Sequence, residues 1–255
     1  MKNLVNFKNK KILIFGASSG IGRQTAIRLS ELGANLIIVA RREEELLKTA
    51  ELCEGTDHGI YPFDVTQIDD IGGLIKNIVD EKGPLDGMVY SVGISNDVPV
   101  TSLNYKRLYN TFESNYFAFV ECVRQTAKRN RYNEGFRIVA VSSVSSLQGE
   151  KSHCAYAGSK AAMDGSVRVM AKELAAKGIC INTVAPGITK TEMSGKILEF
   201  MESGGDSFER IEQRQYLGMI EPGDVANAVC FLLSSAARMI TGITLPVDGG
   251  FTSSC

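Results

Sequence analysis

The chain has 255 residues and a formal net charge of −1, with 44% hydrophobic and 22% charged residues. This length suits one large α/β domain or two small ones, and the balanced charge gives no reason to expect a nucleic-acid partner. No apolar run approaches the ~18 residues of a membrane span, and the N-terminus lacks the apolar core of a signal peptide. We therefore expect a cytoplasmic protein without a membrane segment.

The first predicted strand, at residues 11–15, leads into a glycine-rich turn at 16–22 and then into a helical pattern. A buried strand, a glycine turn and a helix form the first unit of a dinucleotide-binding fold. The glycines let the backbone approach a pyrophosphate, and the N-terminus of the helix favours its negative charge. The candidate cofactor residues of this turn are Gly16, Ser18, Ser19, Gly20, Ile21 and Gly22.

The second predicted strand, at 35–40, is followed by Arg41 and Arg42 and by an acidic helical pattern at 43–52. NAD-binding proteins usually carry an acid at the end of this strand, whereas an arginine accommodates the 2′-phosphate of NADP. We therefore favour NADP over NAD, with Arg41 and Arg42 as candidate phosphate ligands. The alternative is a solvated pair of arginines that balances the glutamates after them.

Strands and helical patterns alternate through the rest of the chain. Further strands are expected at 59–63, 86–90, 136–141, 179–184 and 243–247, and helices at 67–82, 103–130, 155–177 and 222–235. The alternation is not interrupted by a Pro/Gly/Ser-rich linker. The sequence predicts an α/β fold: one doubly wound, Rossmann-like domain over 1–255 with about seven parallel strands and helices on both faces. The irregular segment 188–217 is expected to be a substrate lid.

Turns after the later strands supply the other candidate cofactor contacts. These are Asp64, Val65, Gly93, Pro186, Gly187 and Thr191. Asp64 is placed either to cap a helix or to contact the adenine, against which Val65 would pack. Pro186 and Gly187 end the strand at 179–184 beside the expected nicotinamide position, where Thr191 is a candidate partner of the carboxamide.

Tyr156 and Lys160 lie one turn apart on one face of a helix that begins near residue 155, and Ser143 follows the strand before it. A tyrosine pKa near ~10 must fall by about 3 units for proton exchange at neutral pH, which requires ~4 kcal/mol. An ammonium at roughly 4 Å supplies this at an effective dielectric of about 20. We therefore expect Lys160 to lower the pKa of Tyr156. Taken alone, the pair is also consistent with a surface tyrosine beside a lysine.

Asn115 falls inside the helical pattern at 103–130. Because asparagine lowers helix stability, we expect it to open the helix locally and to hold a water near Lys160. The alternative is a polar spot on a helix face.

The cysteines and histidines give no sign of a metal site. Six cysteines lie at positions 53, 122, 154, 180, 230 and 255, without a Cys-x-x-Cys pair. We interpret them as buried free thiols of a reducing compartment. The two histidines, His58 and His153, are too few for a metal cluster. His153 either lines a pocket near Tyr156 or lies on a loop surface.

Taken together, these motifs resemble the short-chain dehydrogenase/reductase family along nearly the whole chain. The matching residues are Gly16, Gly20 and Gly22 of the cofactor loop, Asp64 at the adenine, the catalytic tetrad Asn115, Ser143, Tyr156 and Lys160, the segment with Pro186, Gly187 and Thr191, and the ending Asp248-Gly249-Gly250. Three departures stand out: Phe15 replaces the usual Thr, Tyr90-Ser91-Val92 replaces Asn-Asn-Ala, and no basic residue lies between Gly16 and Gly20. The first two leave the local support of the strands at 11–15 and 86–90 in question.

The resemblance implies a role for each member of the tetrad. Tyr156 would be the general acid in reduction and the base in oxidation, and Ser143 would hydrogen-bond the substrate oxygen. Lys160 would lower the pKa of Tyr156 and bind the nicotinamide ribose. Asn115 would hold a water in the proton relay. The resemblance also implies a homotetramer assembled through the long helices and the C-terminal strand.

Three functions are compatible with these features. The first is NADP-dependent reduction of a carbonyl, as in 3-oxoacyl-[acyl-carrier-protein] reductases. An acyl carrier protein would then dock on the basic residues Lys128, Arg129, Arg131 and Lys177, although cations at helix C-termini are also favoured by the dipole. The second is oxidation or reduction of a free sugar, steroid or other small secondary alcohol or ketone, with NAD as a second cofactor choice. The third is a non-catalytic dinucleotide-binding regulator, which would be expected to lack part of the tetrad.

Overall fold

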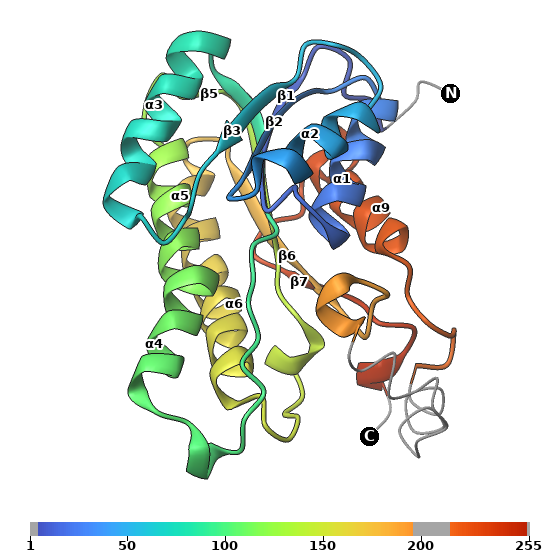
Figure 1. Cartoon of the computed structure of the whole chain (residues 1–255). Coiled ribbons are helices and arrows are strands. Elements are labelled where there is room, and N and C mark those ends of the chain that lie inside the picture. The colour runs from blue at the N-terminus through green and yellow to red at the C-terminus, as the bar shows by residue number, and fades with distance from the viewer. Residues whose placement is uncertain (1–4, 196–214, 254–255) are drawn as a thin grey trace.

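One parallel β-sheet organises the chain (Figure 1). The computed structural model describes residues 5–195 and 215–253, and within them seven strands lie in the order β3-β2-β1-β4-β5-β6-β7, with every pairing parallel. Their bounds are β1 Lys11–Phe15, β2 Asn35–Ala40, β3 Gly59–Pro62, β4 Leu85–Tyr90, β5 Tyr132–Val141, β6 Cys180–Pro186 and β7 Thr244–Val247. The strand order reverses between β1 and β4, where open α/β sheets bind ligands beyond the carboxyl ends of their strands.

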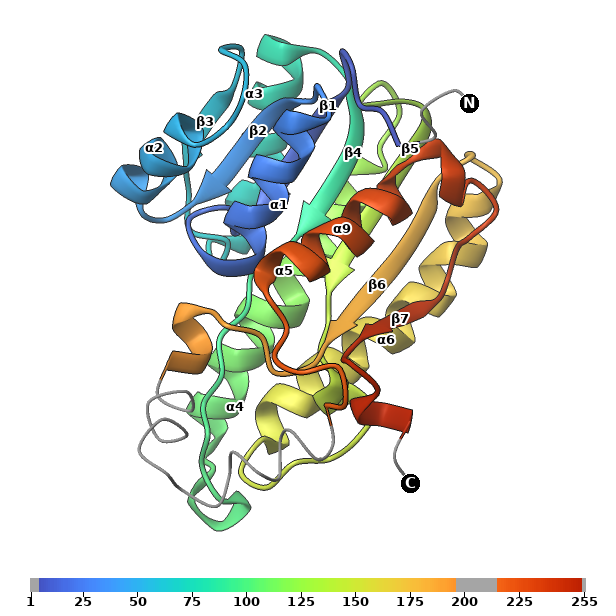
Figure 2. The ribbon, with the colours of Figure 1, turned by 90° about the vertical axis from the view of Figure 1, so that its right-hand side faces the viewer.

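Helices cover both faces of this sheet (Figures 1 and 2). One face carries α3 (Ile71–Lys82), α5 (Ala118–Thr126) and α6 (Cys154–Ala175), with α4 (Tyr105–Phe112) ahead of α5. The other face carries α1 (Gly20–Glu31), α2 (Glu43–Glu51) and α9 (Pro222–Leu233). Short 3-10 turns, including η1 (Ile68–Asp70), η4 (Val144–Ser146) and η5 (Glu192–Ser194), join these elements.

The strands are apolar on both sides because both faces of the sheet are covered. Side chains alternate along β1: Leu13 and Phe15 pack into the core under α3, α5 and α6, whereas Ile12 and Ile14 pack into the core under α1 and α9. These continuous apolar runs made the strands visible in the sequence. The predicted fold class, a doubly wound parallel sheet with helices on both faces, is therefore confirmed.

The element ends differ from the predicted ones in a few places. Strand β5 begins at Tyr132 rather than at residue 136, and the helix predicted at 67–82 begins as the 3-10 turn η1 before α3. The helix predicted at 103–130 is interrupted by a π-helical turn, Glu113–Phe117, between α4 and α5. Much of the predicted lid, residues 196–214, lies outside the described residues, so the lid stays a prediction.

The aromatic departures from the family pattern pack against each other. The ring centroids of Phe15 and Tyr90 are 6.0 Å apart, and those of Tyr90 and Phe119 are 5.5 Å apart. The Tyr90 hydroxyl donates a hydrogen bond to the Ser114 carbonyl, in the π-helical turn. Burial raises the pKa of Tyr90 well above its ordinary value, so the phenol remains a donor. These contacts supply the support of β1 and β4 that the departures left in question.

The cysteines are not as uniformly buried as expected. Cys122 and Cys230 are buried, Cys53 and Cys180 are partly buried, and Cys154 is exposed; all five are free thiols. Among residues 5–195 and 215–253, no group of three or more His, Cys, Asp or Glu side chains is arranged to hold a metal ion. Over the same residues, no helix has the length and apolar character needed to cross a membrane.

Replacing Tyr90 by Phe tests the link between this aromatic cluster and the π-helical turn. We expect Tyr90→Phe to lower the free energy of unfolding by about 1–3 kcal/mol, because the Ser114 carbonyl loses its donor in a buried place. Urea denaturation measures the change. The matched control is Tyr105→Phe, whose side chain is 78% exposed and whose effect should stay within about 0.5 kcal/mol. Equal effects of the two substitutions would contradict a structural role for the Tyr90 hydroxyl.

Candidate active site

A cavity of about 430 Å³ opens at the carboxyl ends of the strands. It brings together almost all of the residues that the sequence singled out. The predicted residues that line it are Gly16, Ser18, Ser19, Gly20, Ile21, Arg41, Arg42, Asp64, Val65, Gly93, Ser143, Tyr156, Lys160, Pro186, Gly187 and Thr191. Gly22 and Asn115 are the exceptions: both lie behind the wall of the cavity and support it.

The glycine turn between β1 and α1 forms one end of the cavity. Gly16 has φ +86°, and a Cβ there would lie 2.8 Å from the Ser91 carbonyl carbon. A Cβ on Gly22 would lie 2.1 Å from the Gly16 carbonyl oxygen, so Gly22 allows α1 to pack closely under the turn. The turn therefore presents backbone and small side chains to the cavity, at the N-terminus of a helix. A dinucleotide pyrophosphate fits this surface, because the amide groups and the helix dipole favour an anion.

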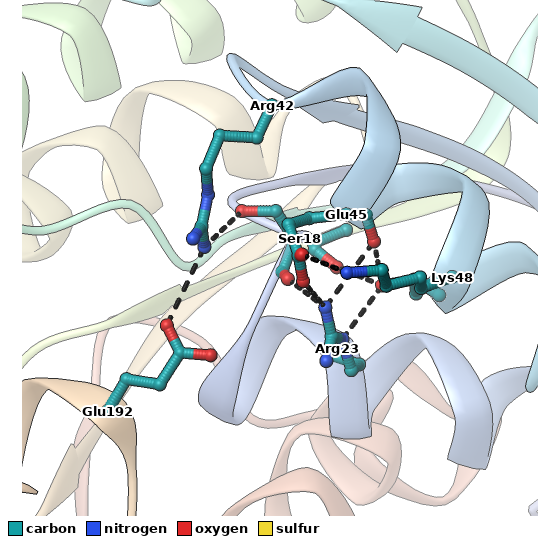
Figure 3. Close-up of polar contacts among 8 residues, drawn as sticks. Ser18, Arg23, Arg42, Glu45, Lys48 and Glu192 are labelled. Carbon is teal, nitrogen blue, oxygen red and sulfur yellow. Dashed lines mark hydrogen bonds and ion pairs between the residues drawn. The ribbon is translucent and has the colours of Figure 1, made fainter.

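Side chains of α1 and α2 brace the turn from behind (Figure 3). Arg23 donates to the Ser18 carbonyl and forms an ion pair with Glu45 at 2.6 Å. The Thr49 hydroxyl lies 2.9 Å from the Ala17 carbonyl oxygen and donates to it. These two contacts turn the carbonyls of Ala17 and Ser18 toward the helices behind the turn. In a trans peptide the N–H points away from the C=O, so the N–H groups of the same two peptides, those of Ser18 and Ser19, point away from α2.

Glu45 is the anionic centre of this brace. Hydrogen bonds from Lys48 and then from Arg23 lower the pKa of Glu45 to about 2. The carboxylate is therefore ionised throughout the physiological range and keeps Arg23 over the turn. Neither Arg23 nor Glu45 belongs to a sequence motif, and their pairing depends on how α1 and α2 pack, so it was not predictable from the sequence.

The two predicted phosphate ligands lie on the rim of the cavity. Arg41 Nη1 is 3.8 Å from Asp64 Oδ2, and its side chain is 68% exposed. Arg42 Nη2 is 3.7 Å from Glu192 Oε2 and 3.5 Å from the Ser18 hydroxyl (Figure 3). Both ion pairs are long and exposed, so they hold the guanidinium groups weakly. Either arginine is free to exchange its carboxylate partner for a phosphate.

Asp64 does not cap a helix, the first of its two predicted roles; its carboxylate closes a local turn onto Thr66 instead, and η1 begins only at Ile68. Its Oδ1 accepts hydrogen bonds from the amide and the hydroxyl of Thr66, at 3.0 and 2.9 Å. The adenine contacts of Asp64 and Val65 stay predictions, supported by the position of both residues in the cavity wall.

Asn115 lies inside the π-helical turn, so the expected local opening of the helix is confirmed. Its side chain is fully buried. It accepts from the Ile94 amide at 2.8 Å and donates to the Ile94 carbonyl and to the Ser159 hydroxyl, both at 3.0 Å. A Cβ on Gly93 would lie 3.3 Å from Lys160 Nζ. Asn115 therefore fixes the chain just after Gly93, where Lys160 approaches. The expected water near Lys160 stays a prediction.

Lys160 is buried at the end of β5. Its Nζ donates to the Val141 carbonyl at 2.7 Å and lies 5.8 Å from the centroid of the Tyr156 ring. Burial lowers the pKa of Lys160 to about 8, and the negative charge of Asp164 opposes this lowering. The side chain therefore carries its charge at neutral pH but loses it under mildly alkaline conditions.

Tyr156 differs from the expectation. Burial raises its pKa above the ordinary value; the Ser143 hydroxyl, which hydrogen-bonds the phenol, opposes the rise, and the charges of Asp97 and Glu150 add to it. The net direction is therefore opposite to the predicted one, because desolvation of the buried phenol outweighs the groups that favour the phenolate. Tyr156 thus keeps its proton at neutral pH, which suits a proton donor.

The part of the cavity beside Tyr156 also holds two carboxylates and an imidazole. His153 Nε2 lies 3.3 Å from Asp97 Oδ1, and His153 Nδ1 lies 3.9 Å from Glu150 Oε2. The imidazole and phenol rings of His153 and Tyr156 are 6.1 Å apart. His153 therefore lines the pocket, the first of its two predicted placements. Asp97 and Glu150 were not predicted as site residues, because they belong to separate loops and to no motif.

A doubly wound sheet, a glycine turn at its switch point and a Ser–Tyr–Lys group in one cavity define a dinucleotide-binding oxidoreductase. Comparison with known proteins supports this class. The family model described as Enoyl-(Acyl carrier protein) reductase matches residues 16–252. Over 252 residues the chain is 32% identical to an L-xylulose reductase of Caenorhabditis elegans, covering 97% of this chain and 98% of the relative.

Two further similarities cover the same length. Over 248 residues the chain is 32% identical to the 3-oxoacyl-[acyl-carrier-protein] reductase FabG of Rickettsia conorii, with 97% and 98% covered. A solved short-chain type dehydrogenase/reductase from Mycobacterium ulcerans superposes with a TM-score of 0.90 at 28% identity, covering 97% of this chain and 91% of that one. The chain belongs to the short-chain dehydrogenase/reductase family of oxidoreductases.

The buried charge of Lys160 should be visible in the pH dependence of stability. Below pH 8 the lysine is protonated in both the folded and the unfolded chain, so the burial penalty is fully present. Between about pH 8 and the ordinary value of 10.5 the folded chain releases this proton first, so stability rises with pH. We expect Lys160→Met to raise the free energy of unfolding at pH 7 by about 2 kcal/mol, and this gain to shrink toward pH 10.

Urea denaturation at pH 7 and pH 10 checks this prediction. Lys172→Met, at an exposed position of the same helix, is the control and should change stability by less than about 0.5 kcal/mol at both values. A Lys160→Met protein that is less stable than the wild type at pH 7, or whose gain does not depend on pH, would contradict the account.

Proposed function

We propose that the protein reduces a carbonyl to a secondary alcohol, with NADP as the hydride carrier and Tyr156 as the proton donor. The observation that supports this most is the meeting of Ser143, Tyr156 and Lys160 in the cavity that the glycine turn closes at its other end. The raised pKa keeps the Tyr156 phenol protonated at neutral pH, as the proposed proton donor requires.

The residues divide the chemistry between them. When bound at the glycine turn, the cofactor would supply the hydride that the carbonyl carbon receives. The electron pair of the C=O bond moves to the oxygen, which takes the proton of the Tyr156 hydroxyl while Ser143 donates a hydrogen bond to it. The phenolate that Tyr156 becomes is stabilised by the buried ammonium of Lys160, whose charge acts strongly where water is excluded.

NADP is favoured over NAD by the rim of the cavity. Strand β2 ends at Ala40, so no acid is placed there to repel a 2′-phosphate, and Arg41 and Arg42 follow it. The rim acid Asp64 is engaged by Thr66 as well as by Arg41. In this proposal the phosphate replaces carboxylates as the partner of the arginines, with hydrogen bonds that are charge-assisted on both sides.

A 3-oxoacyl thioester is our first choice of substrate. It is supported by the 3-oxoacyl-[acyl-carrier-protein] reductases among the relatives. The basic group proposed to receive a carrier protein lies at the far end of α6, where Lys177 donates to the Ala127 carbonyl. That position is roughly 30 Å from Tyr156 along the helix, at 1.5 Å per residue. A carrier protein docked on these basic residues could therefore deliver its acyl group only to the cavity of a neighbouring chain that lies next to them.

A hydroxylated free ketone, such as a sugar, is the second candidate. Asp97 and Glu150 place carboxylates at the cavity opening, where they can accept hydrogen bonds from substrate hydroxyl groups. An L-xylulose reductase is among the relatives. A non-catalytic regulator is not favoured, because Ser143, Tyr156 and Lys160 are all placed in the cavity.

The homotetramer and the cytoplasmic location are further proposals. Assembly through the long helices is supported by exposed aromatic side chains along α4 and the π-helical turn, which are Tyr105, Tyr109 and Phe117. Their rings contact one another, with centroids 6.0 Å apart in each step. Val169 adds an exposed apolar side chain on α6.

Tyr156→Phe tests the proton transfer. We expect turnover to fall by about 10²–10⁴-fold, because the phenyl ring cannot supply the proton, while NADPH affinity changes by less than about threefold. Stopped-flow kinetics and fluorescence titration measure the two quantities. Tyr132→Phe, at the opposite end of β5, is the control and should keep full activity. Substantial residual turnover in Tyr156→Phe would remove Tyr156 from the proton-donor role.

Arg41→Asp tests the cofactor choice. We expect the Kd for NADPH to rise at least about tenfold more than the Kd for NADH, because a charge-assisted hydrogen bond is lost and a repulsive charge is added. Isothermal titration with each cofactor measures this. Lys76→Asp, an equal change of charge on α3, should leave both affinities unchanged. Equal losses for the two cofactors would mean that Arg41 does not bind the 2′-phosphate.

A further inference from the structure

Asp164 is a buried carboxylate on the side of α6 that carries Tyr156 and Lys160. It lies four residues after Lys160 and eight after Tyr156, so the three side chains follow one face of the helix. Only 4% of its surface is exposed. A buried carboxylate is unfavourable unless hydrogen-bond donors or a cation surround it.

Three hydroxyl groups donate to the Asp164 carboxylate. Ser142 and Ser146 donate to Oδ2 at 2.9 and 2.6 Å, and Thr183 of β6 donates to Oδ1 at 2.8 Å. Ser142 and Ser146 lie on either side of Ser143 in the chain. Asp164 thus ties the loop that carries Ser143 both to α6 and to the neighbouring strand.

Lys160 holds the residue just before this loop. Its ammonium donates to the Val141 carbonyl, and Asp164 binds the hydroxyl of Ser142, the next residue. Two side chains one helical turn apart therefore hold two consecutive residues at the end of β5. Burial lowers the pKa of Lys160, and the charge of Asp164 opposes the lowering.

We propose that Asp164 is a positioning residue for Ser143 and Lys160. Through the two loop serines it holds the Ser143 hydroxyl beside Tyr156, and through its charge it keeps the Lys160 side chain an ammonium. Asp164 is not among the residues that line the cavity, so it acts through the others. The inference rests on the proposed carbonyl reduction, in which Ser143 and Tyr156 meet the substrate oxygen.

The charge of Lys160 can be measured without any substrate. We suggest labelling the protein with [ε-¹³C]lysine, assigning the Lys160 resonance with Lys160→Met, and titrating the wild type and Asp164→Asn from pH 6 to pH 11. A charge about one helical turn away, at an effective dielectric of about 20, predicts a midpoint lower by about one to two pH units in Asp164→Asn. The other titratable groups at this end of the cavity, which are Tyr156, Asp97, Glu150 and His153, are retained in the variant.

The same proteins are then compared in turnover. For Asp164→Asn we expect kcat to fall by about tenfold or more, because Ser143 is displaced, with KM nearly unchanged and the alkaline limb of the pH profile moved toward neutral pH. Glu173→Gln removes a carboxylate from an exposed position of α6 and should match the wild type in both measurements. A folded Asp164→Asn protein with the Lys160 midpoint and kcat of Glu173→Gln would overturn the proposal.

Ser146→Ala separates position from charge. It removes one loop hydroxyl from Asp164 but keeps the carboxylate, so we expect a lower kcat with an unchanged Lys160 midpoint. If Asp164→Asn does not fold, Ser146→Ala decides: wild-type kcat would overturn the proposal. If the wild type reduces no carbonyl, the proposed function fails by itself, and the shift of the Lys160 midpoint still supports or overturns the role of Asp164.

Discussion

The burial of a lysine under the end of β5 is the constraint on which the site depends. A charged group in this position is unfavourable, and it is tolerated because the Val141 carbonyl accepts its hydrogen bond and Asp164 supplies a negative charge nearby. The arrangement orders the chain at the point where Ser143 leaves the strand. It also places a positive charge under Tyr156, where negative charge develops during proton transfer. The buried charge of Lys160 thus lowers the stability of the fold at the same place where it supplies a fixed positive charge for the reaction.

Much of the fold could be predicted from the sequence, because burial on both faces leaves continuous apolar runs in strands such as β1 and β2. The interruption of the helix at Asn115 was also predictable, because an asparagine inside a helix lowers its stability. The sequence shows that Phe15 and Tyr90 replace polar residues of the family, but it does not show what stabilises them. Tyr90 packs against Phe119 and donates to the Ser114 carbonyl, and these groups meet it only in the folded chain.

The motif residues of the site were predictable, but its electrostatics were not. Tyr156 and Lys160 lie four residues apart, so their common face follows from helix geometry. The direction of the Tyr156 pKa depends on desolvation and on Asp97 and Glu150, which come from distant loops. The position of Asp164 was predictable, because it lies one turn after Lys160 on the same face of α6. Its burial was not predicted, because an acidic residue in a helix is usually exposed.

The most direct test of the central claim is cofactor oxidation with acetoacetyl thioester as the substrate, with NADPH and NADH measured in parallel. We expect turnover to be much faster with NADPH than with NADH. A ketose measured alongside it separates acyl reduction from sugar reduction. A protein that binds NADPH, yet oxidises neither cofactor with either carbonyl, would contradict the claim that Tyr156 and its neighbours form a carbonyl reductase.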